Sequence, residues 1–140
     1  MNKAELIFGG VFAAIGVFLA ETLGGWDVLL RGLLYLMAFD VITGVVGAFY
    51  HKDAASGEFF KGLAKKVGVL VLVATIVVIE GIFKTTLLRG ATIGFFISME
   101  VLSILENWGK MGVTIPGSIK ATVMSFLRKE GSDNDGKKDD

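Results

Sequence analysis

The chain has 140 residues, of which 14 are basic and 14 acidic, and 53% are hydrophobic. A net charge of zero gives no electrostatic reason to expect nucleic acid as a partner. The sequence has no cysteine and a single histidine, His51, which excludes disulfides, cysteine-metal sites and sites that need two imidazoles. The apolar residues lie in long blocks separated by charged residues, which is typical of an integral membrane protein.

Four apolar segments predict transmembrane helices, at residues 6–23, 28–50, 67–83 and 91–105. A spanning helix needs about 20 residues, so the first, third and fourth segments are barely long enough. Local thinning of the bilayer or snorkelling of flanking side chains would accommodate them. We therefore expect an all-α integral membrane protein with about four short transmembrane helices, or three if the first segment lies in the membrane interface.

Basic residues between these segments predict the orientation. Residues 51–66 contain four lysines, and the chain from Gly109 onward contains six lysines and arginines. The positive-inside rule places both stretches in the cytoplasm, and with four spans it places both termini there as well. Lys61, Lys65 and Lys66 are thus predicted topology determinants, and binding to anionic lipid headgroups is an additional role for them.

The C-terminal part predicts a short amphipathic helix over residues 115–129, with Pro116 suited to its first turn. Its apolar face comprises Ile115, Ile119, Val123, Phe126 and Leu127. Such a helix either lies in the membrane interface or packs on the rest of the protein. The expected organisation is a transmembrane domain at 1–109, a juxtamembrane amphipathic helix at 110–130 and a disordered charged tail at 131–140.

Small residues form a stripe along the first segment. Gly9, Ala13, Gly16 and Ala20 recur at intervals of four, three and four residues and so share one helix face. Small side chains let helices approach closely within a bilayer. The stripe predicts helix packing, either within one chain or between copies of it.

An acidic residue lies in the middle of the second segment. Asp40 shares a helix face with Gly44 and Gly47, which predicts that this face packs against protein or water. An ionised aspartate at the bilayer centre costs about 2.5–3.5 kcal/mol on insertion scales. Asp40 is therefore a candidate pore-lining or triggering residue; the structural alternative is a buried polar contact with Arg31 or Thr43.

The fourth segment has a polar face made of Glu100, Ser103 and Asn107. In a membrane helix such a face favours water or partner helices over lipid, so these residues are further pore or trigger candidates. The alternative is an interfacial helix that never spans the membrane. Glu80 shares no face with small residues and is expected to mark the outer end of the third segment.

Neither a phosphate-binding glycine loop nor a metal-ligand motif is present, so we expect no cofactor, no metal and no enzymatic activity.

Three stretches in order resemble the toxin secretion and phage lysis holin family. They are Asp-Val-Ile-Thr-Gly at 40–44, the segment from Ser56-Gly57 to Lys65-Lys66, and Glu-Val-Leu-Ser-Ile-Leu-Glu-Asn at 100–107, followed by Gly109, Gly112, Ile115 and Pro116. The last stretch is the most specific, and the resemblance covers about two thirds of the chain, from residue 40 to residue 127. The chain departs from the pattern at Glu80, where an aspartate is expected, and at Trp108 and Lys110 among the glycines.

The resemblance implies a holin, which accumulates in the cytoplasmic membrane of a bacterial host and assembles with copies of itself. It then opens lesions at a set time, through which an endolysin escapes to cut peptidoglycan. The implied partners are the lipid bilayer, further copies of the chain and, by function but not necessarily by contact, an endolysin. Relatives of the same family serve toxin export. The alternatives from the residues alone are a small transporter or channel subunit and a membrane anchor without a pore.

Overall fold

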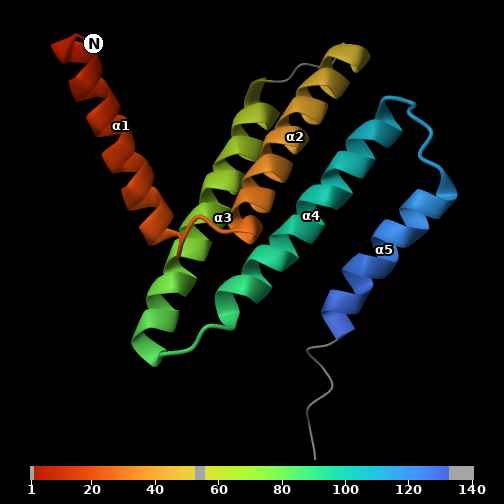
Figure 1. The fold of residues 1–140 in the computed structure, drawn as a ribbon. Helices are drawn as coiled ribbons and strands as arrows, with labels where there is room; N and C mark the ends of the chain where they lie inside the picture. Colours follow the sequence, from red (N-terminus) through yellow and green to blue (C-terminus); the bar gives the residue numbers. More distant parts are fainter. Residues whose placement is uncertain (1, 53–55, 133–140) are drawn as a thin grey trace, which may run out of the picture.

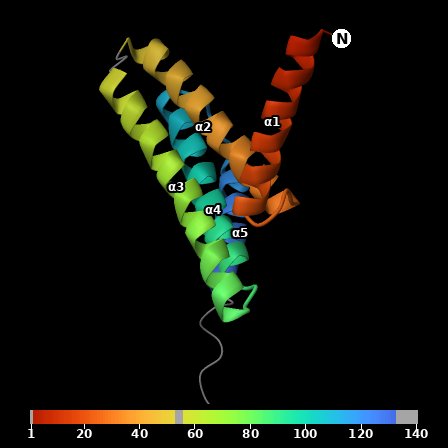
Figure 2. The same ribbon diagram turned by 90° about the vertical axis from the view of Figure 1, so that its left-hand side faces the viewer.

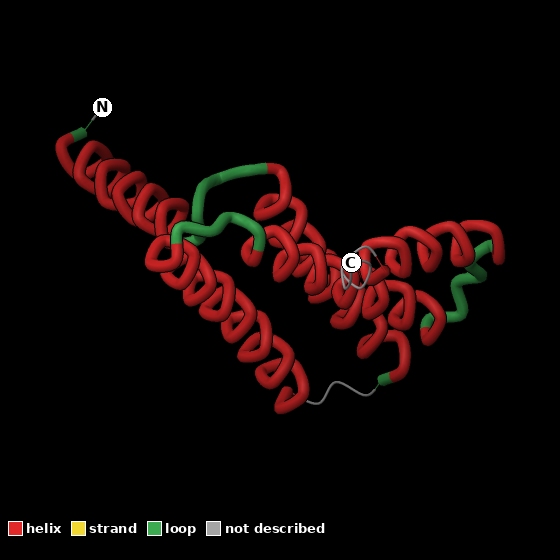
Figure 3. Tube along the Cα trace, turned by 90° about the horizontal axis from the view of Figure 1, so that it is seen from below, coloured by secondary structure: helices red, strands yellow, loops and turns green. Residues whose placement is uncertain are grey.

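The computed structural model describes residues 2–52 and 56–132. Within these residues the chain forms five helices and no strand (Figure 3): α1 (Lys3–Thr22), α2 (Val28–His51), α3 (Ser56–Phe83), α4 (Leu88–Lys110) and α5 (Gly117–Ser132). Helices α1 to α4 are long and apolar enough to cross a membrane. The predicted class, an all-α membrane protein, is therefore confirmed.

The third helix is longer than its apolar segment. The sequence places residues 51–66 in a loop between two transmembrane segments. For residues 56–66 this was wrong, because α3 begins at Ser56 and includes all three predicted topology lysines. Glu58 in the first turn of α3 complements the positive end of the helix dipole, which favours a helix start here. Hydropathy missed this part because it is charged, although its backbone continues the helix without a break.

Helices α2, α3 and α4 form a bundle in which α2 and α4 run parallel and α3 runs antiparallel to both (Figures 1 and 2). Helix α1 leaves this bundle at an angle (Figures 1 and 2), and α5 turns back on the α4 side without extensive contact with the other helices. The start of α1 and the ends of α2 and α4 lie at the same end of the molecule (Figure 1).

The closest packing in the bundle is between α2 and α4. The face of α2 toward the bundle alternates steps of three and four residues: Leu30, Leu33, Met37, Asp40, Gly44, Gly47 and His51. This is the spacing of a coiled-coil seam. Added Cβ atoms would lie 3.6 Å from Asn107 Nδ2 at Gly44 and 3.7 Å from Met111 Cγ at Gly47. The two glycines thus allow α4 to approach the backbone of α2.

An apolar core fills one half of the bundle. It consists of Leu23, Leu30, Leu33, Met37, Val73 and Ile93, all buried. These residues come from the α1–α2 connection and from all three bundle helices. The core therefore lies toward the end where the α1–α2 and α3–α4 connections meet.

Arg89 joins those two connections. Its guanidinium donates to the carbonyl oxygens of Leu23 at 2.7 Å and Gly25 at 3.1 Å, and it pairs with Asp27 at 2.5 Å. Glu80 accepts the backbone N–H of Arg89 at 3.0 Å and so satisfies an amide in the first turn of α4. The hydrogen bond from Arg89 lowers the pKa of the Asp27 carboxyl below its ordinary value. Glu80 thus caps a helix, a role that the sequence pattern did not indicate.

The small-residue stripe of α1 has no packing partner within the described chain. Gly9, Ala13 and Gly16 are exposed, and nothing lies within 4 Å of a Cβ added at either glycine. Ala20, next to the connection, is half-buried. Packing through this stripe would therefore need a surface that one described chain does not supply.

Candidate functional site

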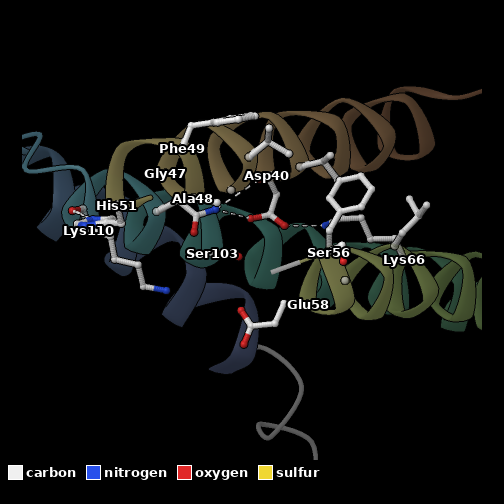
Figure 4. A pocket seen from close by; sticks show the side chains of 17 residues that line it. Asp40, Gly47, Ala48, Phe49, His51, Ser56, Glu58, Lys66, Ser103 and Lys110 are labelled. Atoms are coloured by element: carbon white, nitrogen blue, oxygen red, sulfur yellow. Dashed lines mark hydrogen bonds and ion pairs between the residues drawn. The ribbon is translucent and has the colours of Figure 1, made fainter. Parts of the chain in front are cut away.

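Three charged side chains from three different helices meet inside the bundle. Lys66 Nζ of α3 lies 2.8 Å from Asp40 Oδ2 of α2 and 2.5 Å from Glu100 Oε2 of α4. The exposed fractions of the side chains are 13% for Lys66, 16% for Asp40 and 10% for Glu100. Figure 4 shows Lys66 reaching toward the Asp40 carboxylate. The lysine thus connects two acids that lie 60 residues apart in the chain.

Asn107 extends this network along the α2–α4 seam. Its Nδ2 donates to Asp40 Oδ1 at 3.1 Å and to Thr43 Oγ1 at 3.2 Å. Thr43 Oγ1 in turn donates to the backbone carbonyl of Asp40 at 3.1 Å. Both carboxylate oxygens of Asp40 are therefore engaged, one by an ammonium and the other by an amide. We call Asp40, Lys66, Glu100 and Asn107 the polar network.

The polar network is unbalanced in charge. It contains two carboxylates and one ammonium, so its formal charge is −1 when all three groups are ionised. A buried ion pair repays its desolvation cost only when geometry and hydrogen bonding are good. Here each acid meets the same ammonium, so neither has a counter-ion of its own.

A cavity of about 600 Å³ lies beside the network, between α2, α3 and α4. Its polar lining includes Asp40, His51, Ser56, Glu58, Lys66, Ser103, Asn107 and Lys110 (Figure 4). At the outer end of the cavity, His51 Nε2 lies 2.7 Å from the backbone oxygen of Lys110, which joins the ends of α2 and α4. The bundle thus has an apolar half and a polar, hollow half.

The structure brings together Asp40, Glu100 and Asn107, and it places Ser103 on the cavity wall. Gly44 and Gly47 line the same cavity from α2. Of the two partners considered for Asp40, Thr43 contacts its backbone carbonyl, whereas Arg31 is exposed.

Lys66 is the functional-site residue that sequence reasoning misplaced. It was grouped with Lys61 and Lys65, which are exposed on α3, but Lys66 points into the bundle. A signal was present in the sequence: Lys66 precedes the buried Val73 by seven residues, two helical turns, and so shares its face.

Comparisons with known proteins agree with this architecture. The sequence matches the bacteriophage holin family over residues 17–128. A relative named "Probable holin" from Bacillus phage phi105 is 36% identical over 111 residues, which cover 77% of this chain and 79% of the relative. No solved structure matches the chain.

Bacterial genomes also contain relatives. An uncharacterized protein of Listeria monocytogenes is 34% identical over 134 residues, covering 94% of each chain. An uncharacterized 14.9 kDa protein of Clostridium perfringens is 29% identical over 119 residues, covering 84% of this chain and 90% of the relative. The family match runs from the last turns of α1 through α2, α3 and α4 to near the end of α5, and it includes the polar network. The chain therefore belongs to the bacteriophage holin family, a class of multi-pass membrane proteins that are not enzymes.

Proposed function

We propose that this protein oligomerises in the cytoplasmic membrane of a bacterial host and opens lesions that release an endolysin. The observation that carries the proposal is a charged network buried among helices that are apolar enough to span a membrane. Family membership and the likeness to the probable holin of Bacillus phage phi105 support the same function. Endolysin is a partner by function, because it needs only a lesion wide enough to pass.

Both termini lie in the cytoplasm in this proposal, which requires α5 to lie along the cytoplasmic surface of the membrane and not beside α4 as in Figure 1. The exposed Lys61 and Lys65 are in the part of α3 nearest the α2–α3 connection. The end of α2 and the start of α3 are at the same end of the molecule as the start of α1 and the end of α4 (Figure 1). By the positive-inside rule, the basic end faces the cytoplasm.

The polar network supplies the mechanism. In a closed subunit, Asp40 and Glu100 are held by Lys66 between helices. On assembly, α2 and α4 turn this face toward water. Water then solvates the three charged groups, so their ion pairs can separate. A membrane potential acts on a charge with about 2.3 kcal/mol per 100 mV. With a formal charge of −1 in each subunit, an oligomer gathers enough charge to couple opening to the potential.

Assembly itself uses α1. Its stripe of Gly9, Ala13, Gly16 and Ala20 is unoccupied within one described chain, and α1 leaves the bundle at an angle. In a bilayer, such a stripe packs against a helix that can approach closely. A second copy of the chain supplies that helix.

The test is induction of the protein in bacteria while a dye follows the membrane potential. We expect an abrupt collapse of the potential after a quiet interval, and lysis when an endolysin is co-expressed. Asp40→Asn and Glu100→Gln should shift the time of collapse at equal protein levels. Normal growth with the protein confirmed in the membrane would favour an anchor or transporter subunit and would contradict the proposal. Unchanged timing in both variants would remove the polar network from the mechanism.

A further inference from the structure

The cavity beside the polar network extends from one end of the bundle to about its middle. Its outer lining comes from His51, Ser56 and Lys110, at the ends of three helices, and its inner lining from Asp40 and Lys66. Asp40 lies eleven residues before His51. At 1.5 Å per residue this is about 16 Å, roughly half of a hydrocarbon core of about 30 Å.

The inner end of the cavity needs water. Asp40 and Lys66 line the cavity there, and together with Glu100, which is not part of the lining, they carry a formal charge of −1 at mid-bundle depth. Charged groups at this depth face protein or a water-filled cavity, because lipid tails cannot solvate them. Ser103, Glu58 and Lys110 add polar groups along the wall. A cavity of about 600 Å³ has ample room for water molecules, each of which takes about 30 Å³ in the liquid.

The cavity does not continue through the bundle. Beyond Asp40 the facing side chains are those of the apolar core: Leu33, Val73 and Ile93 are 0% exposed and Met37 is 5% exposed. An apolar region packed this closely stays dry. A single subunit therefore has a polar entrance that ends at this part of the apolar core, which we call the dry block.

We propose that each subunit contains a blind, water-filled vestibule that admits water and small hydrated ions from the α2–α3 end as far as the polar network. The vestibule is the cavity lined by Asp40, Gly44, Ala48, Lys66, Ser103 and Asn107. Its lining carries two acids, Asp40 and Glu58, and two lysines, Lys66 and Lys110, so its formal net charge is zero. The vestibule rests on the proposed function in one respect: α2, α3 and α4 must cross the membrane. It gives water and ions access to the Lys66 ion pairs from one face before any lesion opens.

The chain contains no cysteine, so single-cysteine variants can map the vestibule against a clean background. Ser103→Cys places a thiol on the vestibule wall, whereas Val73→Cys places one in the apolar core. Ile42→Cys is the matched control, because Ile42 lies close to the depth of Asp40 but is 57% exposed on the outer side of α2. Ala48→Cys is a second vestibule position, in case Ser103→Cys fails to accumulate.

The probe is a membrane-impermeant methanethiosulfonate. It is added to membrane vesicles of both orientations, prepared from cells that are harvested before the potential collapses. A thiol reacts as the thiolate, which needs water, so Ser103→Cys should react about tenfold or more faster than Ile42→Cys and Val73→Cys. It should react from one face only.

Equal rates at Ser103→Cys and Ile42→Cys would mean that lipid fills the cavity, and this would overturn the vestibule. Reaction of Ser103→Cys from both faces, or of Val73→Cys at the same rate, would overturn the dry block. The lysis time of each variant is measured separately. If Ser103→Cys or Ala48→Cys lyses cells on time but stays unlabelled, the vestibule is contradicted and the proposed function still stands.

Discussion

Lys66 occupies the centre of the polar network, since it is the positive group within pairing distance of both Asp40 and Glu100. Removing one partner of a buried ion pair leaves an uncompensated charge. We therefore expect Lys66→Met to lower the stability of the bundle by about 3 kcal/mol, and to advance the collapse of the potential. Lys66→Arg keeps the charge and should cost less. Thermal unfolding in detergent and the time of collapse measure the two effects.

The control for Lys66 restores the charge balance without restoring the lysine. Lys66→Met combined with Asp40→Asn and Glu100→Gln leaves no charge in the network, so it should be more stable than Lys66→Met alone. A triple variant as unstable as the single variant would show that the uncompensated carboxylates are not what destabilises Lys66→Met.

The pair of Asp27 and Arg89 predicts a dependence of stability on pH. Arg89 lowers the pKa of Asp27 in the folded protein below its ordinary value of 3.8. Asp27 therefore contributes stability above the unfolded pKa, and this contribution is lost as the pH falls through the lower, folded pKa. Asp27→Asn retains a good N-cap for α2 but removes the charge.

The measurement compares the thermal midpoints of the parent and Asp27→Asn in detergent. The parent should be the more stable of the two at pH 5 to 7, by a modest margin because the Asp27 side chain is 44% exposed. The margin should shrink only below the ordinary pKa. A margin that shrinks already near neutral pH would point to another titrating group.

At the scale of elements, the α1–α2 connection depends on a glycine. Gly24 has φ +81°, and a Cβ there would lie 2.6 Å from Arg89 Nε and 2.9 Å from Val77 Cγ2. Gly25 has φ +109°, but nothing lies within 4 Å of its added Cβ. Both Gly→Ala variants incur backbone strain of about 1 kcal/mol, and Gly24→Ala must also displace the Arg89 side chain. We expect Gly24→Ala to have the lower thermal midpoint, and equal midpoints would contradict the contact with Arg89.

The sequence predicts which parts of the chain form helices better than it predicts the residues at which those helices begin and end. The apolar segments at 6–23 and 28–50 agree closely with α1 and α2, because these helices are apolar almost throughout. Helix α3 begins eleven residues before its apolar segment, and α4 extends beyond residues 91–105 at both ends. Hydropathy detects the part of a helix that suits lipid, whereas backbone hydrogen bonding continues into charged turns.

The candidate site is predictable in its residues but not in its pairing. Acids inside apolar segments identify Asp40 and Glu100, since each is costly in a bilayer. Nothing in the local sequence indicates that one lysine pairs with both acids. Asp40 and Glu100 are 60 positions apart, and Lys66 reaches both only because α3 folds back antiparallel to α2 and α4. The heptad steps of α2 would have helped, since they place Asp40 on the same face as Leu33 and Met37.

At the scale of the whole molecule, one half of the bundle is packed and apolar, and the other half is hollow and polar. The apolar core and the Arg89 contacts hold one end together, while the cavity and the polar network occupy the other. Helices α2 and α4 share the closest packing, so α3 is the helix with the smaller attachment to each neighbour. Lys66 of α3 forms ion pairs with both helices of that pair. A change at this one residue can therefore alter how three helices are arranged.

Assembly belongs to α1, and two adjacent alanines test it. Ala13 lies in the small-residue stripe and Ala14 lies outside it, yet both are exposed in the described chain. Replacing either by leucine makes the same chemical change and keeps the helix apolar. If copies pack through the stripe, Ala13→Leu should weaken cross-linking between subunits in the membrane and delay lysis, because the larger side chain holds the backbones apart. Ala14→Leu should leave both unchanged.

Neither substitution touches the α2–α4 packing, so the thermal midpoint of the bundle should stay the same in both variants and show that the chain still folds. Equal cross-linking in Ala13→Leu and Ala14→Leu would remove the stripe from assembly. Subunits would then have to meet through the exposed outer faces of α2 to α4, where large apolar side chains such as Phe39, Val71 and Phe95 are available. Such an interface would place the polar network nearer to the contact between subunits, and lysis timing would depend on those side chains instead.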